Sequence, residues 1–382
     1  MQRYVKLTIV SVFLLLACTN CIVSPGGIPA NATSNNGVGD ADLLKVLRQA
    51  RKSSNVPAMA AALITDQGLQ KIAAIGTRKW GTDSPVTIND QWHLGSDTKA
   101  MTATLAAILV EEGRLKWTTT VTEVFPDFAD SFNSGFRDVT LLQLLSHEAG
   151  LPADLNYATI GQSISVRDQR LQAVRMALHD KPLSAPGTQY LYSNVGYIIV
   201  GAMIERVTGM DWETAITQDV FIPLKMGSVG FGGLGTPGMI DQPWGHLGVG
   251  KPVAFNGPDA DNPPVLGPAG RVHSTIQDWG LFIADQLRGA RGEPGLLSLE
   301  SYQMLQNPHF GGDYALGWIV VNRDWAGGKA LAHTGSNTMY LADVWIAPEK
   351  DFAILVCTNE GLDSFTAADQ AVAGIIKIAE GR

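Results

Sequence analysis

The chain has 382 residues, a net charge of −8 at pH 7 and three cysteines, and 45% of its residues are hydrophobic against 17% charged. This length and composition indicate a well-packed globular protein with one large or two intimate domains, and they exclude a disordered or fibrous chain. Because the charge is negative and no long run of Lys or Arg occurs, we expect no nucleic-acid partner and favour a small organic substrate.

Residues 1–18 are typical of an export signal. Arg3 and Lys6 precede an apolar stretch, residues 7–17, that is too short to span a bilayer as a helix. Residues 15–18, Leu-Leu-Ala-Cys, are similar to the lipobox of bacterial lipoproteins, in which Cys18 would become the lipid-bearing mature N-terminus. We therefore expect an exported protein of the periplasm or cell envelope. It is either tethered to a membrane through a lipid on Cys18 or cleaved nearby and released.

Residues 19–40 are rich in Pro, Gly, Asn and Ser, which predicts a flexible tether before a folded body at 41–380. Apolar periodicity predicts strands near both ends of this body and mostly helices between 96 and 297. We therefore expect an α/β (α+β) fold. An antiparallel sheet flanked by helices, built from residues 41–95 and 298–380, carries an inserted, mainly helical lobe. Besides the helix that begins near Ser96, the expected helices are 41–53, 140–145, 166–178, 197–208, 275–287 and 364–378. The expected strands are 58–64, 71–75, 316–321, 330–333, 341–346 and 352–357.

Ser96 and Lys99 lie at the start of a predicted helix that stops at Gly113. The i, i+3 spacing puts the Lys99 amine on the same helical face as the Ser96 hydroxyl. A serine hydroxyl needs such a neighbour to become a nucleophile, and a helix N-terminus also favours developing negative charge. Taken alone, an S-x-x-K string is better explained by a helix-capping serine followed by a solvated lysine.

Two more polar segments follow in the chain. Tyr192 and Asn194 flank a serine before an apolar helix, and an extended backbone would point both side chains to one side, offering a phenol and an amide. A buried tyrosine with a turn asparagine is the alternative for this tripeptide. Further on, residues 333–336, His-Thr-Gly-Ser, end an apolar strand, where a glycine would let a substrate backbone approach closely. A simple strand end turning at glycine is the alternative there.

The order S-x-x-K, Y-x-N, H-T-G resembles the serine β-lactamase and penicillin-binding-protein superfamily. The resemblance covers most of residues 41–380 and adds residues 144–152 (Leu-Leu-Ser-His-Glu-Ala-Gly-Leu-Pro) and 268–270 (Pro-Ala-Gly). Within the superfamily, the sequence is most similar to the class C branch and the related DD-peptidases, D-aminopeptidases and esterases. The reason is that a tyrosine, Tyr192, stands where other branches have the serine of an S-D-N motif.

The resemblance implies a role for each matching residue and needs no cofactor or metal. Ser96 would attack the substrate carbonyl, while Lys99 and Tyr192 would share the proton transfers. Backbone N–H groups of Ser96 and Ser336 would form the oxyanion hole. Contacts to substrate would come from the remaining motif residues, Asn194, His333, Thr334 and Gly335.

One residue departs from the β-lactamase pattern. His333 stands where those enzymes place a lysine, and a histidine with a pKa near about 6.5 is mostly neutral at pH 7. We therefore predict a serine hydrolase acting through an acyl-enzyme at Ser96, and rank small esters or amides first, D-peptides second and β-lactams third as its substrates. A catalytically inactive binding or scaffold protein of the cell envelope is the non-enzyme alternative.

Overall fold

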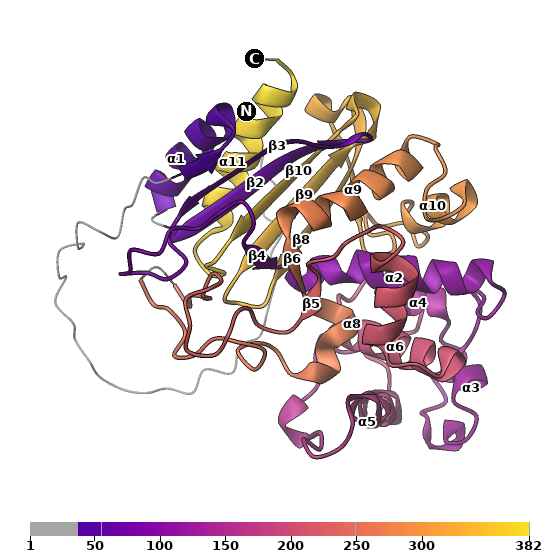
Figure 1. Ribbon diagram of the computed structural model, residues 1–382. Helices are drawn as coiled ribbons and strands as arrows, with labels where there is room; N and C mark the ends of the chain where they lie inside the picture. The colour runs from indigo at the N-terminus through magenta and orange to yellow at the C-terminus, as the bar shows by residue number, and fades with distance from the viewer. Residues whose placement is uncertain (1–36, 55, 249, 382) are drawn as a thin grey trace.

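The structure is a computed structural model that describes residues 37–54, 56–248 and 250–381. The predicted signal segment, Cys18 and residues 19–36 of the expected tether lie outside the described residues. Within the described part, no helix combines the length and the hydrophobicity needed to cross a membrane. The α-helices of the described residues, most of them labelled in Figure 1, are α1 Ala41–Ser54, α2 Thr98–Glu111, α3 Val121–Val124, α4 Leu141–Leu145, α5 Val166–His179, α6 Asn194–Thr208, α7 Trp212–Ile216, α8 Gly267–Gly270, α9 Ile276–Ala290, α10 Leu299–Leu305 and α11 Phe365–Ala379.

The main sheet joins the two ends of the described chain. Its strands follow the order β1-β3-β2-β10-β9-β8-β7, and every neighbouring pair is antiparallel. Strand β2, from the N-terminal segment, pairs with β10, from the C-terminal segment, which confirms the predicted fold class. The strands are β1 Gly37–Gly39, β2 Ala58–Thr65, β3 Gly68–Gly76, β4 Gln91–His93, β5 Gly230–Phe231, β6 Val272–Thr275, β7 Ile319–Arg323, β8 Gly328–Ser336, β9 Leu341–Ala347 and β10 Phe352–Thr358. Strands β4, β6 and β5 form a second, smaller sheet.

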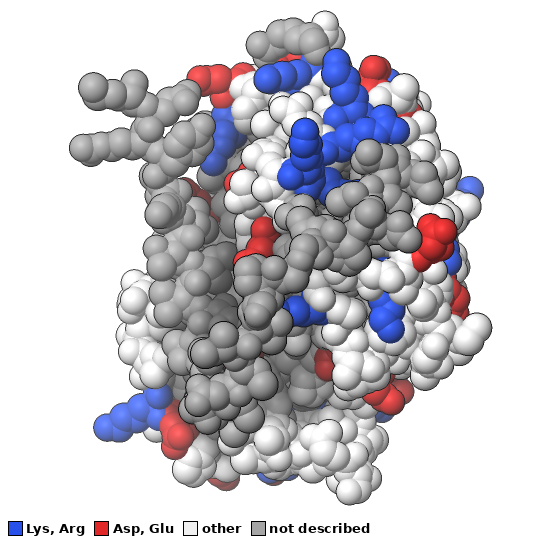
Figure 2. All heavy atoms as spheres, turned by 90° about the vertical axis from the view of Figure 1, so that its left-hand side faces the viewer, with Lys and Arg blue, Asp and Glu red and all other residues white. Residues whose placement is uncertain are grey.

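Helices cover both faces of the main sheet (Figure 1). Alternate residues of β10 face opposite sides: Ile354 and Val356 pack with α1 and α11, whereas Leu355 and Cys357 join the larger core on the other face. Cys357 is therefore a buried core residue. Figure 2 turns the side that carries α1 towards the viewer, and Lys and Arg side chains gather at the upper end of this face.

Helix α9 belongs with the sheet and not with the helical lobe to which residues 96–297 were assigned. It packs against β2, β3 and β10. A Cβ on its Gly280 would come within 2.8 Å of the Ile64 side chain, so a glycine allows this close approach. The sheet therefore has α1 and α11 on one face and α9 on the other, which explains why β2 and β10 are apolar at nearly every position.

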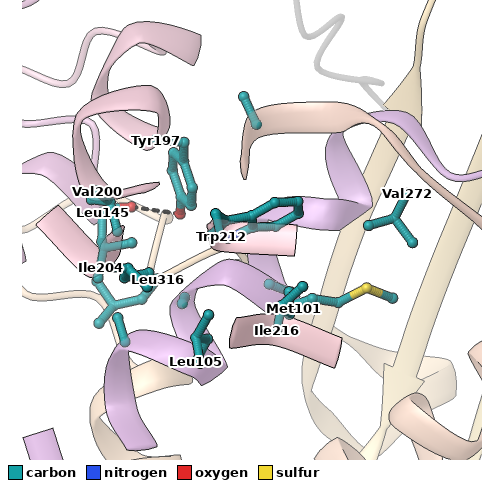
Figure 3. Close-up of a cluster of buried hydrophobic side chains, with 14 of the residues drawn as sticks. Met101, Leu105, Leu145, Tyr197, Val200, Ile204, Trp212, Ile216, Val272 and Leu316 are labelled. Carbon is teal, nitrogen blue, oxygen red and sulfur yellow. Dashed lines mark hydrogen bonds between the residues drawn. The ribbon is translucent and has the colours of Figure 1, made fainter. Parts of the chain in front are cut away.

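The helical lobe is built around α2, the helix that follows Ser96. Helix α2 is apolar on nearly all sides because α6, α7, α8 and α10 surround it. Figure 3 shows Met101 and Leu105 of α2 among side chains of α6 and α7, including Tyr197 and Trp212. Burial of this kind contributes about 1.5–3 kcal/mol per large apolar side chain. Packing along α2 therefore fixes the position of its first turn.

Among the boundaries that differ from the predicted ones, three concern the start of an element. Residues 37–39, expected in the tether, form β1 and pair with β3. Strand β7 begins at Ile319 and not at residue 316, because Gly317 has a φ of +86° and turns the chain beside Ala100. The helix predicted from Ser96 begins at Thr98, because a 3-10 turn, η2 Gly95–Asp97, precedes it.

Candidate active site

The turn that carries Ser96 is held against the end of β8 by two glycines. Gly95 has a φ of +50°, and a Cβ at this position would lie 2.3 Å from the Ser336 nitrogen. A Cβ on Gly335 would lie 1.9 Å from the Leu94 carbonyl oxygen. Any larger residue would separate the two segments. The close approach that the sequence predicted at Gly335 is therefore made by the turn of Ser96 itself.

Ser96 keeps some exposure in a buried stretch, since residues 92–95 and 97–100 are buried and Ser96 is half-buried. Its Oγ lies 3.1 Å from Lys99 Nζ and 2.8 Å from Tyr192 Oη. The three residues therefore meet as the sequence predicted, although Tyr192 is nearly a hundred residues away in the chain. A hydroxyl that is partly exposed and contacted by two titratable groups is the arrangement that nucleophilic catalysis requires.

Lys99 is fully buried and its amine has three polar neighbours. Besides Ser96, Nζ donates to Asn194 Oδ1 and to the Ala269 carbonyl oxygen, each at 2.8 Å. Burial lowers the pKa of Lys99 to about 7, although the carboxylates of Asp154 and Asp97 oppose this effect. Near neutral pH a large share of the amine is therefore unprotonated.

Tyr192 stays protonated beside Ser96. Burial raises the pKa of its phenol above the ordinary value, and the hydrogen bond to Ser96 only partly offsets this effect. Lys99 Nζ lies 4.8 Å from the centroid of the Tyr192 ring, so the amine contacts the ring as well as the hydroxyl that both residues share. In the resting site, the phenol donates to the Ser96 oxygen.

Asn194 is oriented by a carboxylate that the sequence analysis did not single out. The Nδ2 of Asn194 donates to Asp154 Oδ1 at 2.9 Å. The Oδ1 of Asn194 therefore faces Lys99. Tyr157 Oη also donates to Asp154 Oδ1, at 2.8 Å. Ser193, between Tyr192 and Asn194, caps α6 by accepting from the Gly196 nitrogen. The helix cap therefore sends the two neighbouring side chains towards Ser96.

His147 fixes the segment that carries Tyr192. Its carbonyl oxygen accepts from the Leu191 nitrogen at 2.8 Å, and its Nδ1 accepts from the Ser193 nitrogen at 3.0 Å. Its ring centroid lies 4.4 Å from that of Tyr192 and 4.6 Å from that of Tyr314. His147 therefore has a packing role immediately beside the site.

His333 does not face Ser96. The ring is 4% exposed, with Nδ1 3.0 Å from Asp97 Oδ1 and Nε2 3.4 Å from Tyr314 Oη. Burial lowers the pKa of His333 to about 3, and the Lys99 charge adds to this effect. Both ring nitrogens therefore have partners within the protein, and the contact of His333 with a substrate stays a prediction.

At the end of β8, polar side chains bond to groups within the protein, whereas one edge of the main chain has no strand partner. Thr334 Oγ1 donates to Asp343 Oδ1 at 2.8 Å, and Ser336 Oγ donates to the Tyr340 carbonyl oxygen at 2.7 Å. Strand β7 pairs with β8 only at residues 328–332, so residues 333–336 have no strand partner on that side. The Ser336 amide nitrogen lies beside Gly95, the residue before Ser96.

Several polar groups at the site were not predicted as site residues. His147 and the Ala269 carbonyl lie in segments 144–152 and 268–270, which the family resemblance had marked without giving them a role. Asp97 directly follows the nucleophile. Asp154 and Tyr314 carried no signal in the sequence. Among the described residues, no group of three or more His, Cys, Asp or Glu side chains is placed to hold a metal ion.

A comparison with protein families matches residues 43–375 to the family described as Beta-lactamase. The chain belongs to this family. Within the family, it is 27% identical over 338 residues to "Penicillin-binding protein 4" of Amycolatopsis lactamdurans, covering 82% of this chain and 83% of that protein. It is 26% identical over 284 residues to "Protein flp" of Staphylococcus aureus (strain COL), covering 72% of this chain and 53% of that protein. The chain thus matches about half the length of "Protein flp".

Solved structures of similar fold include the octameric penicillin-binding protein homologue from Pyrococcus abyssi. It superposes with a TM-score of 0.71 at 22% identity, covering 89% of this chain and 77% of that chain. A structure described as SurE gives a TM-score of 0.70 at 22% identity, covering 89% of this chain and 76% of that chain. These likenesses confirm the β-lactamase and penicillin-binding-protein fold predicted from the motifs. Activity of the serine-hydrolase type is what the family supports in general.

Proposed function

We propose that this protein is a serine hydrolase that forms an acyl-enzyme at Ser96, with small uncharged esters or amides as its first-ranked substrates. The observation that carries the proposal is the set of three oxygen atoms around the Lys99 amine. A neutral amine has two hydrogens and one lone pair. Asn194 Oδ1 and the Ala269 carbonyl oxygen accept hydrogens only, so the lone pair is left for the hydroxyl of Ser96.

In acylation, neutral Lys99 accepts the Ser96 proton as Oγ forms a bond to the substrate carbonyl carbon. The carbonyl oxygen becomes an oxyanion held by the amides of Ser96 and Ser336. As the tetrahedral intermediate collapses, the bond to the leaving group breaks. The leaving group takes a proton from Tyr192, and the Lys99 ammonium then returns a proton to the phenolate, so that both residues regain their starting protonation states. Water then repeats these steps on the acyl-enzyme and releases the acid.

The charge around the site supports an uncharged substrate. Lys99 places a charge near His333, whose pKa it lowers, and Asp154 adds an exposed carboxylate. His333 is buried and neutral where a lysine would bind a substrate carboxylate. Penicillin and D-peptide substrates both carry such a carboxylate. We therefore keep D-peptide hydrolysis second and β-lactam hydrolysis third, although a relative is named "Penicillin-binding protein 4".

The proposal is tested by assaying wild type and Ser96→Ala on p-nitrophenyl butyrate, nitrocefin and a D-alanyl-D-alanine peptide. We expect turnover of the ester by wild type, weaker or no turnover of the other two, and loss of all activity in Ser96→Ala. Labelling with a fluorescent fluorophosphonate should give one covalent adduct per wild-type chain and none in the variant.

Two outcomes would change the conclusion. Equal rates for the two proteins on every substrate would favour an inactive binding or scaffold protein. Ser96-dependent turnover of nitrocefin or the peptide above that of the ester would keep the acyl-enzyme and reverse the substrate ranking.

A further inference from the structure

We propose that Asp261 is a positioning residue that holds the two amides of the oxyanion hole at their mutual spacing, through His93 on one side and Asn337 on the other. The inference rests on the proposed function for the meaning of that hole. The network itself consists of hydrogen bonds between buried groups, none of which contacts the Ser96 hydroxyl.

The first arm runs to the nucleophile turn. The Gly95 amide donates to His93 Nδ1 at 3.0 Å, so Nδ1 carries no proton and Nε2 carries the ring proton. Nε2 lies 2.8 Å from Asp261 Oδ2 and donates to it. Asp261 thereby fixes the tautomer of His93, and His93 fixes the left-handed turn at Gly95 that directs the next amide, that of Ser96.

The second arm runs to the end of β8. Asn337 Nδ2 donates to Asp261 Oδ1 at 2.7 Å, and Asn337 Oδ1 accepts from the amides of Met339 and Tyr340 at 3.2 and 3.1 Å. Asn337 directly follows Ser336, so this loop determines how far the Ser336 amide extends towards Gly95. The Asn337 side chain is 2% exposed.

The carboxylate between the arms is fully buried and charged. Burial raises the pKa of Asp261, but His93, Arg271 and Asn337 together bring it below the ordinary value. Arg271 Nε lies 3.3 Å from Oδ2 and supplies the balancing charge. These three partners all donate to the carboxylate. A replacement side chain that donates a hydrogen bond in its place would leave a buried donor without an acceptor.

The two arms meet again at the hole. A Cβ on Gly95 would lie 2.3 Å from the Ser336 nitrogen, so the two segments touch there. Behind them, the rings of Tyr340 and His93 stack with centroids 5.9 Å apart. Hydrogen bonds thus connect Gly95 through His93, Asp261 and Asn337 to the loop that follows Ser336. Because they are connected, the turn at Gly95 and the end of β8 cannot shift independently. Oxyanion stabilisation depends on such fixed donors, because the developing charge lasts too briefly to reorganise them.

The test replaces Asp261 by Asn, which keeps the size and removes the charge and one acceptor. With p-nitrophenyl butyrate, kcat should fall by about tenfold to about 100-fold while KM changes little, because the hole acts on the transition state. The inhibition constant of phenylboronic acid, whose Ser96 adduct places an oxygen in the hole, should rise by the same factor as kcat/KM falls.

Asp285→Asn is the matched control. Asp285 is also buried, and it bonds to Tyr302 Oη and the Leu296 amide on the far side of α9. This variant should lose stability with kcat and boronate affinity unchanged. Should Asp261→Asn fail to fold, Asn337→Ala tests one arm while the carboxylate keeps His93 and Arg271, and a smaller fall in kcat with unchanged KM is expected.

A second measurement is independent of activity. In hydrogen exchange followed by mass spectrometry, Asp261→Asn should accelerate exchange in both peptides 92–98 and 334–340, and Asp285→Asn in neither. A folded Asp261→Asn variant with unchanged kcat, or with accelerated exchange in one peptide alone, would overturn the inference. If Ser96→Ala matched wild type on every substrate, the proposed function would fail, and the exchange data would still decide whether Asp261 couples the two segments.

Discussion

The two sides of the site use different parts of the chain. On the helical side, Lys99 and Tyr192 contact the Ser96 hydroxyl, and Asn194 contacts the Lys99 amine. On the strand side, the polar side chains of β8 bond to groups inside the protein, and the main chain of Ser336 lies beside the turn that carries Ser96. In the proposed mechanism, the helical side transfers protons and the strand side contributes an amide.

Lys99 and His333 illustrate the difference between the helical side and the strand side, because burial lowers the pKa of both residues. Lys99 keeps contact with the partly exposed Ser96, and its pKa of about 7 leaves it able to gain and lose a proton near neutral pH. His333, with a pKa of about 3, stays neutral and bonds to Asp97. Burial produces a useful base only where the group also reaches a reacting atom.

The largest expected effect comes from Lys99→Arg. The guanidinium keeps the positive charge and much of the reach, but it does not lose its proton in a protein, so it cannot act as a base. We expect kcat/KM for p-nitrophenyl butyrate to fall by about 10³-fold. The measurement is steady-state kinetics on protein whose fold has been checked by circular dichroism. Activity close to wild type would show that the charge of Lys99 matters and its proton transfer does not.

An intermediate effect is expected from pH. Lys99 has a lowered pKa, so the fraction with a free lone pair is large above about pH 7 and decreases as the pH falls below it. The logarithm of kcat/KM should therefore be flat above this point and fall by about one unit per pH unit below it. Rates measured from pH 5 to pH 9 in constant ionic strength check this shape.

Asp343 is the control for the assignment of that profile, because burial raises its pKa to about 7 as well. Its carboxylate accepts from Thr334 Oγ1 on the strand side. If Lys99 is responsible, Asp343→Asn should keep the midpoint near pH 7. A profile that becomes flat in Asp343→Asn would move the titrating group from the helical side to the strand side.

Much of the fold was predictable from the sequence because it depends on local patterns. Apolar periodicity placed α5, β2 and β10 nearly to the residue. The error at α9 has a tertiary cause, since a helix with one strong apolar face packs equally well on a sheet or on other helices. The shift of β7 arises from Gly317, whose left-handed conformation follows from its contact with Ala100 and is invisible in a single sequence.

The helical side of the site was likewise predictable, because Lys99 is one turn from Ser96 and the cap at Ser193 directs its neighbours. The strand side was not. The hydrogen bond of the His333 ring is made with Asp97, which is 236 residues away in the chain. Likewise, nothing local in the sequence around Asp154 or Asp261 indicates that these carboxylates reach Asn194 and His93. Such contacts are set by the packing of distant segments.

The smallest effect is expected from His333→Asn, which tests whether the strand side takes part in chemistry. The Asn amide nitrogen takes the place of Nδ1 beside Asp97, while Tyr314 Oη loses its contact with His333 and keeps its hydrogen bond with Tyr197. We expect the free energy of unfolding to fall by about 0.5–1.5 kcal/mol, because one buried hydrogen bond is lost. With p-nitrophenyl butyrate, kcat/KM should stay near wild type, because the ring contacts neither Ser96 nor Lys99. Denaturant unfolding and steady-state kinetics separate the two quantities. A loss of activity as large as that of Lys99→Arg would mean that His333 reaches the reacting atoms, and the division between a proton-transferring side and a main-chain side would be wrong.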